Sequence, residues 1–456
     1  MVQAAARPAV LPEIAVSITQ AIAAFAVETP AGDLPAGARH VLRLSMLDWL
    51  AVAAAAVDEP VSRIVRGVAA REGGLGEASV IGLAARLPAR AAALVNATTG
   101  HALDYDDTHF LHVGHPTTVV LPAALAIAEA TGADGDDLLA AALIGVESAC
   151  RIGHWLGRRH YDLGFHQTAT SGAFGAAMAA ARLLGLDAGR ACHALSIAAT
   201  RASGLKSQFA TMGKPYNAGI ASANGVEAAR LAEAGFVSRV DGLECSQGFA
   251  DTHAGEAVGL DTVLDGLGRS FVFEAVQHKF HACCHGLHAA LEALARVRDD
   301  AGLAPDDVAR VWLAVNPRWL GVCNIAAPAT ALEAKFSYRL AAAMVLAGRD
   351  TAALSAFTDA VCRDRELCRL RDRIEVAGAA HLPDTAATAV IELASGGAIE
   401  AGHDLAAPLD PAVREARVRA KAATLLGEAR AQGLWRRIEA LSAARPPVDW
   451  GALLRA

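Results

Sequence analysis

Apolar residues recur along most of this chain at three- and four-residue intervals, the spacing of an amphipathic helix with one buried face. The pattern predicts early helices over residues 14–27, 36–57 and 60–71. Alanine- and glycine-rich stretches continue it and predict helices over 119–131, 138–156, 171–184, 188–201 and 219–235. The N-terminal part is therefore expected to be mainly helical, with one short strand at Ala78–Gly82.

The periodicity changes beyond about residue 260, where alternating residues indicate strands. The expected strands are Val311–Val315, Arg373–Val376, Thr388–Leu393 and Ala398–Ala401, the last two forming a hairpin across a Gly-Gly turn. Helices over 286–297 and 331–347 flank them, and residues 411–456 return to a helical pattern.

These patterns divide the chain into two parts. At 456 residues the chain is longer than one hydrophobic core usually supports. We predict a mainly α protein with a large all-helical domain built from both chain ends, residues 1–267 and 406–456. A smaller α+β domain covers residues 268–405. We expect the C-terminal helical segment to pack back on the first domain.

Composition and charge exclude several classes of function. The net charge of −7 and the lack of a basic run argue against nucleic acid or an anionic membrane surface as a partner. Apolar runs stay shorter than the ~18 residues that a membrane span needs. Eight cysteines in this length do not resemble a secreted disulfide framework, and the N-terminus lacks a signal-peptide pattern. A cytoplasmic location is therefore expected.

Three polar loops stand before small-residue helices. The first contains His101, Asp104, Thr108 and His115 in the string GHALDYDDTHFLHVGHPTT. The second runs from Tyr161 to Thr168 and contains His166. The third places Lys214 before a proline, which biases the lysine away from helical angles and into the loop. Thr117 is expected to cap the helix after the first loop.

Helix N-termini carry unpaired N–H groups and partial positive charge, which suits a carboxylate ligand. A lysine near such an end and near imidazoles would become a usable base, and neutral histidines could move protons near pH 7. Lys214, His166 and His115 are therefore the candidate proton-transfer residues. A structural role for each, and a helix-capping role for Asp104 and its neighbours, remain alternatives.

Histidine-rich stretches raise the alternative of a metal-dependent hydrolase. His101, His109, His112 and His115 precede one helix, and residues 278–288 contain four more histidines and two cysteines. However, HExxH and CxxC patterns are absent from the sequence, and His281 with His285 at i, i+4 is only a partial zinc pattern. We therefore predict neither a metal nor an organic cofactor.

The chain resembles the MmgE/PrpD family from about residue 15 to 440. The resemblance lies in the order of the three loops, followed by the Lys279…Cys284…His288 segment and by Glu333-Ala334-Lys335-Phe336-Ser337. The family includes 2-methylcitrate dehydratase, cis-aconitate decarboxylase and iminodisuccinate epimerase. The resemblance implies a helical domain, an α+β lid domain, a homodimer and catalysis without a cofactor.

The resemblance also implies a pocket for a small carboxylate substrate. The family's pocket positions correspond here to Asp104, Thr108, His115, His166, Lys214 and Lys279. Cys284 stands where the decarboxylase branch has a histidine, and a tyrosine of that branch is missing between Val311 and Phe336. Cis-aconitate decarboxylation is therefore disfavoured.

Tyr161 resembles the epimerase arrangement, in which a tyrosine and a lysine act on opposite faces of a carbon. We predict an isomerase or lyase that removes the proton α to a carboxylate of a small di- or tricarboxylic acid. An iminodisuccinate-epimerase-like reaction is the first choice, with a 2-methylcitrate-dehydratase-type reaction as the alternative. Tyr161, Lys214, His166 and His115 would be catalytic, and Asp104, Thr108, Lys279 and Cys284 would bind substrate.

Overall fold

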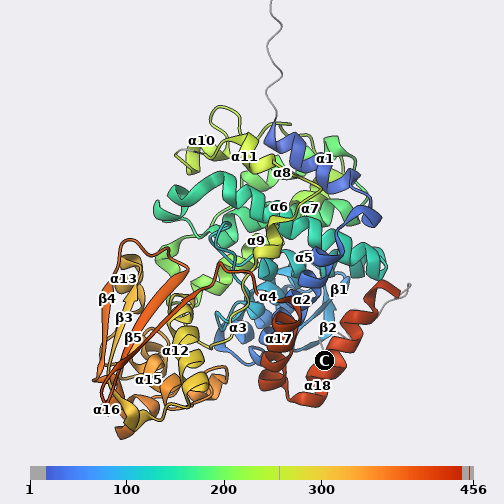
Figure 1. Ribbon diagram of the computed structural model, residues 1–456. Coiled ribbons are helices and arrows are strands. Elements are labelled where there is room, and N and C mark those ends of the chain that lie inside the picture. The colour runs from blue at the N-terminus through green and yellow to red at the C-terminus, as the bar shows by residue number, and fades with distance from the viewer. Residues whose placement is uncertain (1–16, 256, 444–450, 452–456) are drawn as a thin grey trace, which may run out of the picture.

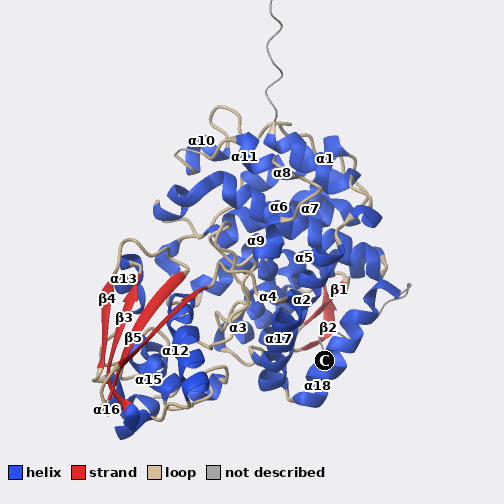
Figure 2. Cartoon of the chain, in the orientation of Figure 1, coloured by secondary structure: helices blue, strands red, loops and turns tan. Residues whose placement is uncertain are grey.

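The computed structural model describes residues 17–255, 257–443 and 451, which form a large helical body beside a smaller part that contains a four-stranded sheet (Figures 1 and 2). The helices of the body's first section are α1 (Ile18–Glu28), α2 (Ala36–Ala55), α3 (Pro60–Glu72), α4 (Ala89–Gly100), α5 (Thr117–Thr131), α6 (Gly135–Asp162), α7 (Gln167–Leu183), α8 (Ala188–Ala199), α9 (Gly213–Glu233), α10 (Phe249–His253) and α11 (Leu260–Leu264). A two-stranded hairpin, β1 (Ala78–Val80) and β2 (Leu83–Leu87), joins α3 to α4.

The remaining helices are α12 (His288–Ala301), α13 (Leu320–Cys323), α14 (Ala331–Ala334), α15 (Tyr338–Leu346), α16 (Arg365–Arg371), α17 (Pro411–Leu426) and α18 (Glu428–Glu439). The sheet contains β3 (Val308–Val315), β4 (Ile374–Gly378), β5 (Ala386–Leu393) and β6 (Ala398–Asp404) in the order β4-β3-β5-β6. Strand β3 is parallel to β4 and antiparallel to β5, and β5 and β6 form the predicted hairpin.

The sheet is covered on one face by helices. Alternate residues of β3 are buried, with Val311, Leu313 and Val315 inside and Trp312 39% exposed. This is the period-two pattern of a strand with one face against a core. Helices α12 and α15 lie beside the sheet (Figure 2).

Glycine allows the central helices of the body to pack closely. A Cβ atom at Gly175 in α7 would lie 2.4 Å from the backbone oxygen of Gly145 in α6. A Cβ at Gly225 in α9 would lie 2.5 Å from the Cβ of Ala176. Small side chains therefore set the spacing of α6, α7 and α9, which explains how a core with few aromatic residues remains dense.

The C-terminal helices return to the helical body, as predicted, with α17 against α2 (Figure 1). Lys421 of α17 forms a buried ion pair with Asp48 of α2, at 2.6 Å, and donates to the backbone oxygen of Tyr105 at 2.6 Å. Arg417 of α17 contacts Glu292 of α12. Helix α17 thus joins the body, the first polar loop and the sheet-containing part.

The buried apolar residues form two clusters, one in the helical body and one in the sheet-containing part. One contains residues of α1–α9 and of α17 and α18, and the other contains β3–β5, α12 and α15 together with Val52 and Tyr105. The mainly helical fold with a small sheet agrees with the predicted class. The domain boundaries at 268 and 405 stay predictions.

Several predicted element boundaries were wrong. Helix α6 continues to Asp162 after a break at Gly157, whose φ is +70°, so Tyr161 lies in a helix. Helix α9 begins at Gly213, which places Lys214 in its first turn, because proline is tolerated where N–H groups have no helical partner. Thr117 is the first residue of α5, and its hydroxyl donates to Asp107 at 2.6 Å instead of capping the helix.

Two further helices are shorter than predicted. The helix expected over 331–347 is interrupted, since Ser337 accepts from the backbone N–H of Leu340 and caps α15 separately. The helical segment expected over 411–456 breaks at Gly427, whose φ is +83°. Residues 444–450 and 452–456 of that prediction lie outside the described residues.

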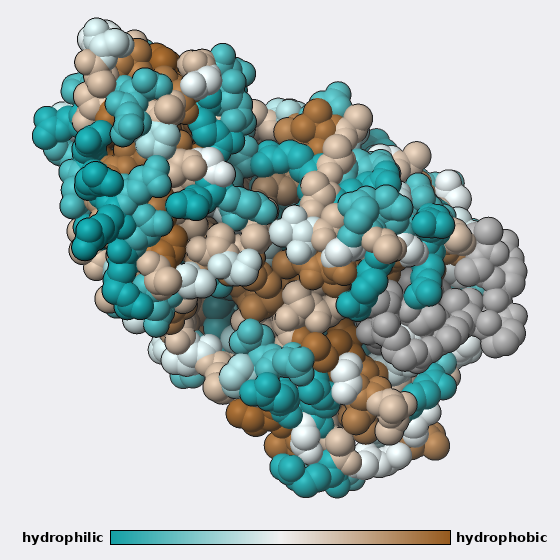
Figure 3. All heavy atoms as spheres, turned by 90° about the horizontal axis from the view of Figure 1, so that it is seen from below, coloured by the Kyte–Doolittle hydropathy of each residue, from teal (hydrophilic) through white to brown (hydrophobic). Residues whose placement is uncertain are grey.

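Within the described part of the chain, no single helix has the length and apolar character to cross a bilayer, and α2 and α3 meet the criterion only jointly across an 88° bend. The face seen from below is mostly polar, with apolar side chains in separate small patches (Figure 3).

Candidate active site

The carboxylate of Asp104 is the centre of the candidate site. Its Oδ2 lies 2.7 Å from Nζ of Lys214, and its Oδ1 lies 3.0 Å from Nζ of Lys279 and 3.5 Å from Nε2 of His115. Lys279 also donates to the Asp104 backbone oxygen at 2.6 Å. Two ammonium groups from distant parts of the chain therefore share one carboxylate.

Charge around Asp104 explains the titration of this group and of Lys279. Burial alone would raise the pKa of Asp104, but Lys214 and Lys279 hold it well below its ordinary value. Burial would lower the pKa of Lys279, and the carboxylates of Asp104 and Asp106 raise it instead. Asp104 and Lys279 are therefore both charged at neutral pH.

The loop that carries Asp104 has an unusual backbone. Asp104 has φ of +51° and Val113 has φ of +55°, a conformation that costs a β-branched residue energy. Next to Val113, a Cβ on Gly114 would lie 2.7 Å from the backbone nitrogen of Thr168. The Thr168 hydroxyl in turn accepts from the N–H of His115 at 3.1 Å. The first loop is therefore held tightly against the start of α7.

The predicted convergence of three helix starts is present in the structure. His115 immediately precedes Pro116 and α5, His166 is the residue before α7, and Lys214 lies in the first turn of α9. Nδ2 of Asn217, also in α9, lies 3.3 Å from Nδ1 of His166. These ends bring partial positive charge to the surroundings of Asp104.

Sequence reasoning missed a buried His–Asp–His arrangement beside Asp104. The Asp106 carboxylate lies 2.9 Å from Nδ1 of His101 and 3.2 Å from Nδ1 of His115. The His101 ring stacks on His166 at 5.8 Å and meets His115 edge-on at 4.6 Å. The spacing of His101 and Asp106 within the histidine-rich loop was the available signal. Asp106 thus bonds to the ring of His101 and lies beside the ring of His115.

Two imidazoles of this site, those of His115 and His166, are neutral at neutral pH. Burial lowers the pKa of His115 to about 4, although the nearby Asp106 carboxylate opposes the shift. Burial, with charge on His101 and Lys214, holds the pKa of His166 well below its ordinary value. Both rings are therefore suited to hydrogen bonding with a ligand more than to holding an extra proton.

The raised pKa of Asp107, another carboxyl group of the loop, should make the stability of the fold depend on pH. Burial and the charge of Asp48 raise its pKa to about 7, although the Thr117 hydrogen bond opposes the rise. The folded value exceeds an unfolded value of about 4, so stability from this group is complete below pH ~4 and is lost as pH rises to ~7. Asp107→Asn should remove that loss.

Urea unfolding of Asp107→Asn and of the parent protein from pH 4.5 to 8 measures this effect. The free-energy difference should shift in favour of the variant up to about pH 7 and then stay constant. Asp58→Asn, at an exposed position, is the matched control. A pH-independent difference for Asp107→Asn would contradict the assignment.

The sheet-containing part contributes the other side of the site. Thr108 pairs through its backbone with Gln277, at 2.8 and 2.7 Å, and its hydroxyl lies 2.5 Å from Nδ1 of His285. Cys284 donates its N–H to the backbone oxygen of Lys335 at 3.0 Å and is partly exposed. The hydroxyl of Thr108 thus contacts His285, which sequence reasoning had considered only as a metal ligand.

Tyr161 approaches from the end of α6. Nζ of Lys206 lies 3.7 Å from the centre of its ring and donates to its backbone oxygen at 2.9 Å. Burial raises the pKa of the Tyr161 phenol, Arg158 opposes the rise, and negative charge at Cys284 and Asp104 adds to it. Tyr161 is therefore a protonated phenol at neutral pH, within electrostatic range of the Asp104 cluster.

One group of side chains has the spacing of a metal site. Ligand atoms of His101, Asp104, Asp106 and His115 lie within 4.8 Å of one another. However, the ammonium groups of Lys214 and Lys279 already occupy positions on Asp104 where a cation would bind. Asp104 therefore lacks the free carboxylate that a divalent ion prefers.

The other predicted histidines are placed separately. Nε2 of His109 lies 2.7 Å from the Val272 backbone oxygen, and Nδ1 of His112 lies 3.1 Å from that of Ala149. His281 pairs with Glu292 at 3.3 Å. These imidazoles bind core or framework groups and do not complete a metal site with His115.

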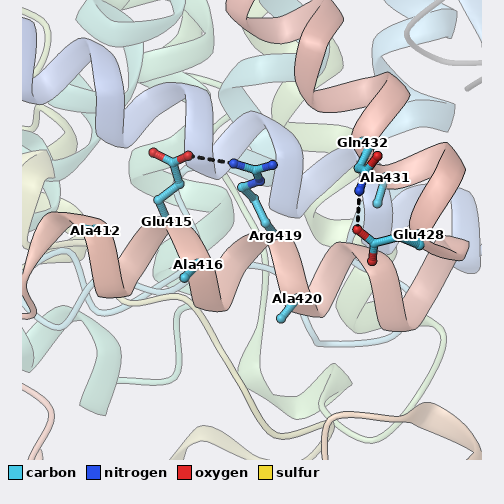
Figure 4. Close-up of a pocket in the computed structure, with 8 residues that line it drawn as sticks. All are labelled: Ala412, Glu415, Ala416, Arg419, Ala420, Glu428, Ala431 and Gln432. Carbon is cyan, nitrogen blue, oxygen red and sulfur yellow. Dashed lines mark hydrogen bonds and ion pairs between the residues drawn. The ribbon is translucent and has the colours of Figure 1, made fainter.

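A hollow of about 480 Å³ between α17 and α18 lies away from this chemistry (Figure 4). Alanines line it together with two pairs that bind each other, Glu415 with Arg419 at 3.0 Å and Gln432 with Glu428 at 2.5 Å. Its polar side chains thus already bind each other within the helices. The Asp104 cluster is the stronger candidate for a ligand site.

The fold is helical with a small α+β part, and the site is a cluster in which Lys214 and Lys279 share the Asp104 carboxylate. The MmgE/PrpD N-terminal domain model matches residues 20–258, and the MmgE/PrpD C-terminal domain model matches residues 281–444. The chain therefore belongs to the MmgE/PrpD family.

Several similar proteins are named cis-aconitate decarboxylase. The protein from Aspergillus terreus is 31% identical over 291 residues, 61% of this chain and 59% of its own length. The proteins from Homo sapiens and Mus musculus are 36% and 35% identical over 175 residues, 37% of this chain and 36% of theirs. The matched region spans about three fifths of the fungal relative's length. These relatives support an enzyme of the family and leave isomerase and lyase open.

Proposed function

We propose that this protein transfers a proton at the carbon α to a carboxylate of a small di- or tricarboxylic acid, without a metal or organic cofactor. The observation that carries the proposal is the Asp104 carboxylate held by Lys214 and Lys279 at 2.7 and 3.0 Å. Two buried or partly buried ammonium groups favour an anionic ligand, and they also stabilise the charge that develops when an α-proton leaves.

Among such reactions we propose an epimerisation like that of iminodisuccinate epimerase. Epimerisation needs two proton-transfer groups on opposite faces of a carbon, and Tyr161 and Lys214 come from different helices around Asp104. Cys284, at the position of a decarboxylase-branch histidine, supports a reaction other than decarboxylation.

A lyase reaction is the second candidate. The named relatives favour it, because each is a cis-aconitate decarboxylase. Dehydration of a 2-methylcitrate-type hydroxy acid would also start with α-proton removal and would require an acid for the leaving hydroxyl. All three reactions would therefore use the same charged cluster, and a homodimer of cytoplasmic location is the family expectation that accompanies them.

Incubation in D2O with malate, aspartate, citrate, 2-methylcitrate and cis-aconitate tests the proposal. Mass spectrometry should show deuterium on the α-carbon of at least one acid, and chiral chromatography should show inversion. Tyr161→Phe should reduce inversion about a hundredfold. It should reduce deuterium exchange with retention of configuration by a smaller factor. An alkene or CO2 product without inversion would favour the lyase instead.

Lack of exchange with every acid would contradict both reactions. Metal analysis of the same purified protein separates the third alternative, a metal-dependent hydrolase, since stoichiometric zinc or iron with hydrolytic activity would support it.

A further inference from the structure

Residues 204–209 form a short segment beside the second polar loop. The backbone oxygen of Gly204 accepts from the N–H of His166 at 2.9 Å. The N–H of Lys206 donates to the backbone oxygen of Gly164 at 2.8 Å. These backbone hydrogen bonds fix the segment against the loop that follows Tyr161.

Lys206 of this segment lies over the ring of Tyr161. Its Nζ is 3.7 Å from the ring centre and donates to the Tyr161 backbone oxygen at 2.9 Å. The guanidinium of Arg158 lies farther away, 5.6 Å from the same ring centre, and pairs with Asp384 at 3.1 Å and with Asp162 at 3.9 Å. Lys206 forms no ion pair with a carboxylate of the described residues. Its charge is therefore the less compensated of the two.

A cation over the face of an aromatic ring is attracted to a neutral phenol, and far more strongly to a phenolate, whose negative charge spreads into the ring. Burial disfavours the phenolate of Tyr161 and raises its pKa. Arg158 opposes the rise. Negative charge at Cys284, Asp104 and Asp162 adds to it. A phenol that transfers its proton here therefore needs a further cation close to its ring.

We propose that Lys206 is a positioning residue for Tyr161 and that its ammonium group stabilises the phenolate that forms when Tyr161 transfers its proton. The proposal rests on the proton-transfer function above and assigns a role to a lysine that precedes the third polar loop. The hydrogen bond from Lys206 to the Tyr161 backbone oxygen keeps the ammonium group over the ring during the reaction.

The step balances within the site. Lys214, as its amine, takes the α-proton, so a C–H bond breaks and an N–H bond forms. The electron pair stays on the carbon and spreads into the substrate carboxylate. On the opposite face the O–H bond of Tyr161 breaks, the electron pair forms a new C–H bond, and the negative charge passes to the phenolate beside Lys206. In the reverse direction this phenolate takes the proton, so Lys206 acts in both directions.

Spectrophotometric titration of the phenols at alkaline pH tests the electrostatic role without turnover. The chain has four tyrosines, and Tyr105 and Tyr338 are buried, so Tyr161 and Tyr216 titrate first. The difference between the parent protein and Tyr161→Phe isolates the Tyr161 signal. Lys206→Met should move its midpoint upward by about one pH unit, and Lys206→Arg should restore it. An unmoved midpoint in Lys206→Met would overturn the proposal.

Arg190→Met is the matched control for this titration. It removes an exposed cation of α8 that pairs with Asp187, so the Tyr161 midpoint should stay where it is in the parent protein. An equal shift in Arg190→Met and Lys206→Met would attribute the effect to net charge and overturn the specific role of Lys206.

Inversion of the accepted acid tests the role in the reaction. Lys206→Met should lower kcat for inversion about tenfold, the equivalent of one pKa unit, and change KM less than about twofold. Lys206→Arg should recover most of the rate. Inversion by Lys206→Met at the parent rate would overturn this role. If the parent protein itself neither exchanges nor inverts any acid, the proposed function fails together with the role of Lys206 in it, and the titration alone decides whether Lys206 stabilises the phenolate.

Discussion

Lys214→Ala is expected to lower solvent-deuterium incorporation about a thousandfold, the upper part of the range for loss of a general acid or base. The variant loses one of two ammonium groups on Asp104, at 2.7 Å, and one proton donor. Both kcat and kcat/KM should fall, because the lost interaction strengthens as charge develops on the substrate. Exchange monitored by mass spectrometry in D2O measures the effect.

Lys214→Arg separates charge from proton transfer. Arginine keeps a cation beside Asp104 but does not release its proton near neutral pH, so binding of citrate should persist while exchange stays low. Calorimetric titration with citrate supplies the binding readout. If Lys214→Arg exchanges protons as fast as the parent protein, Lys214 acts only through its charge.

Lys421→Ala is expected to destabilise the fold by about 3–5 kcal/mol, the cost of leaving one buried charge without its partner. Lys421 is 2% exposed and is paired with the fully buried Asp48 at 2.6 Å. The variant also leaves the Tyr105 backbone oxygen without its donor. Urea unfolding followed by circular dichroism at pH 7 measures the loss.

The double variant Asp48→Leu/Lys421→Met is the control for this interpretation. It removes both charges and keeps the buried volume, so most of the lost stability should return. A double variant as unstable as Lys421→Ala would attribute the effect to the packing of α17 and not to the uncompensated carboxylate.

Most elements of the fold follow from local patterns. The three-residue periodicity predicted α2, α3 and α5–α9, and the Gly-Gly turn predicted the β5–β6 hairpin. Errors occurred where one residue overrides the pattern, at Gly157 inside α6 and at the Ser337 cap of α15. Such breaks depend on a single backbone angle or a side-chain cap, which periodicity does not record.

The sequence indicated which residues gather around Asp104, but it did not indicate which of them contact each other. Polar residues at three helix starts indicated His115, His166 and Lys214, and the family resemblance indicated Asp104 and Lys279. The contacts among them join residues 110 to 175 positions apart, and no local pattern specifies which carboxylate meets which lysine. His101 with Asp106 was missed because each was judged separately.

The functional roles of the predicted residues stay predictions. The structure refines what each can do: His115 and His166 are neutral rings, Tyr161 holds its proton, and Lys214 is ion-paired. Burial made these differences, and burial is a property of the folded chain that residue type alone does not determine.

The Lys421 hydrogen bond to the Tyr105 oxygen spans 316 positions of sequence, and Tyr105 is the residue after Asp104. During synthesis at about 5–20 residues per second, the loop that carries Asp104 therefore emerges long before the helix that anchors it. Nascent chains that end before α17 lack this anchor, so ligand binding should begin only after α17 has been made. The order of the chain thereby delays assembly of the site until more than 300 residues after the Asp104 loop have been added.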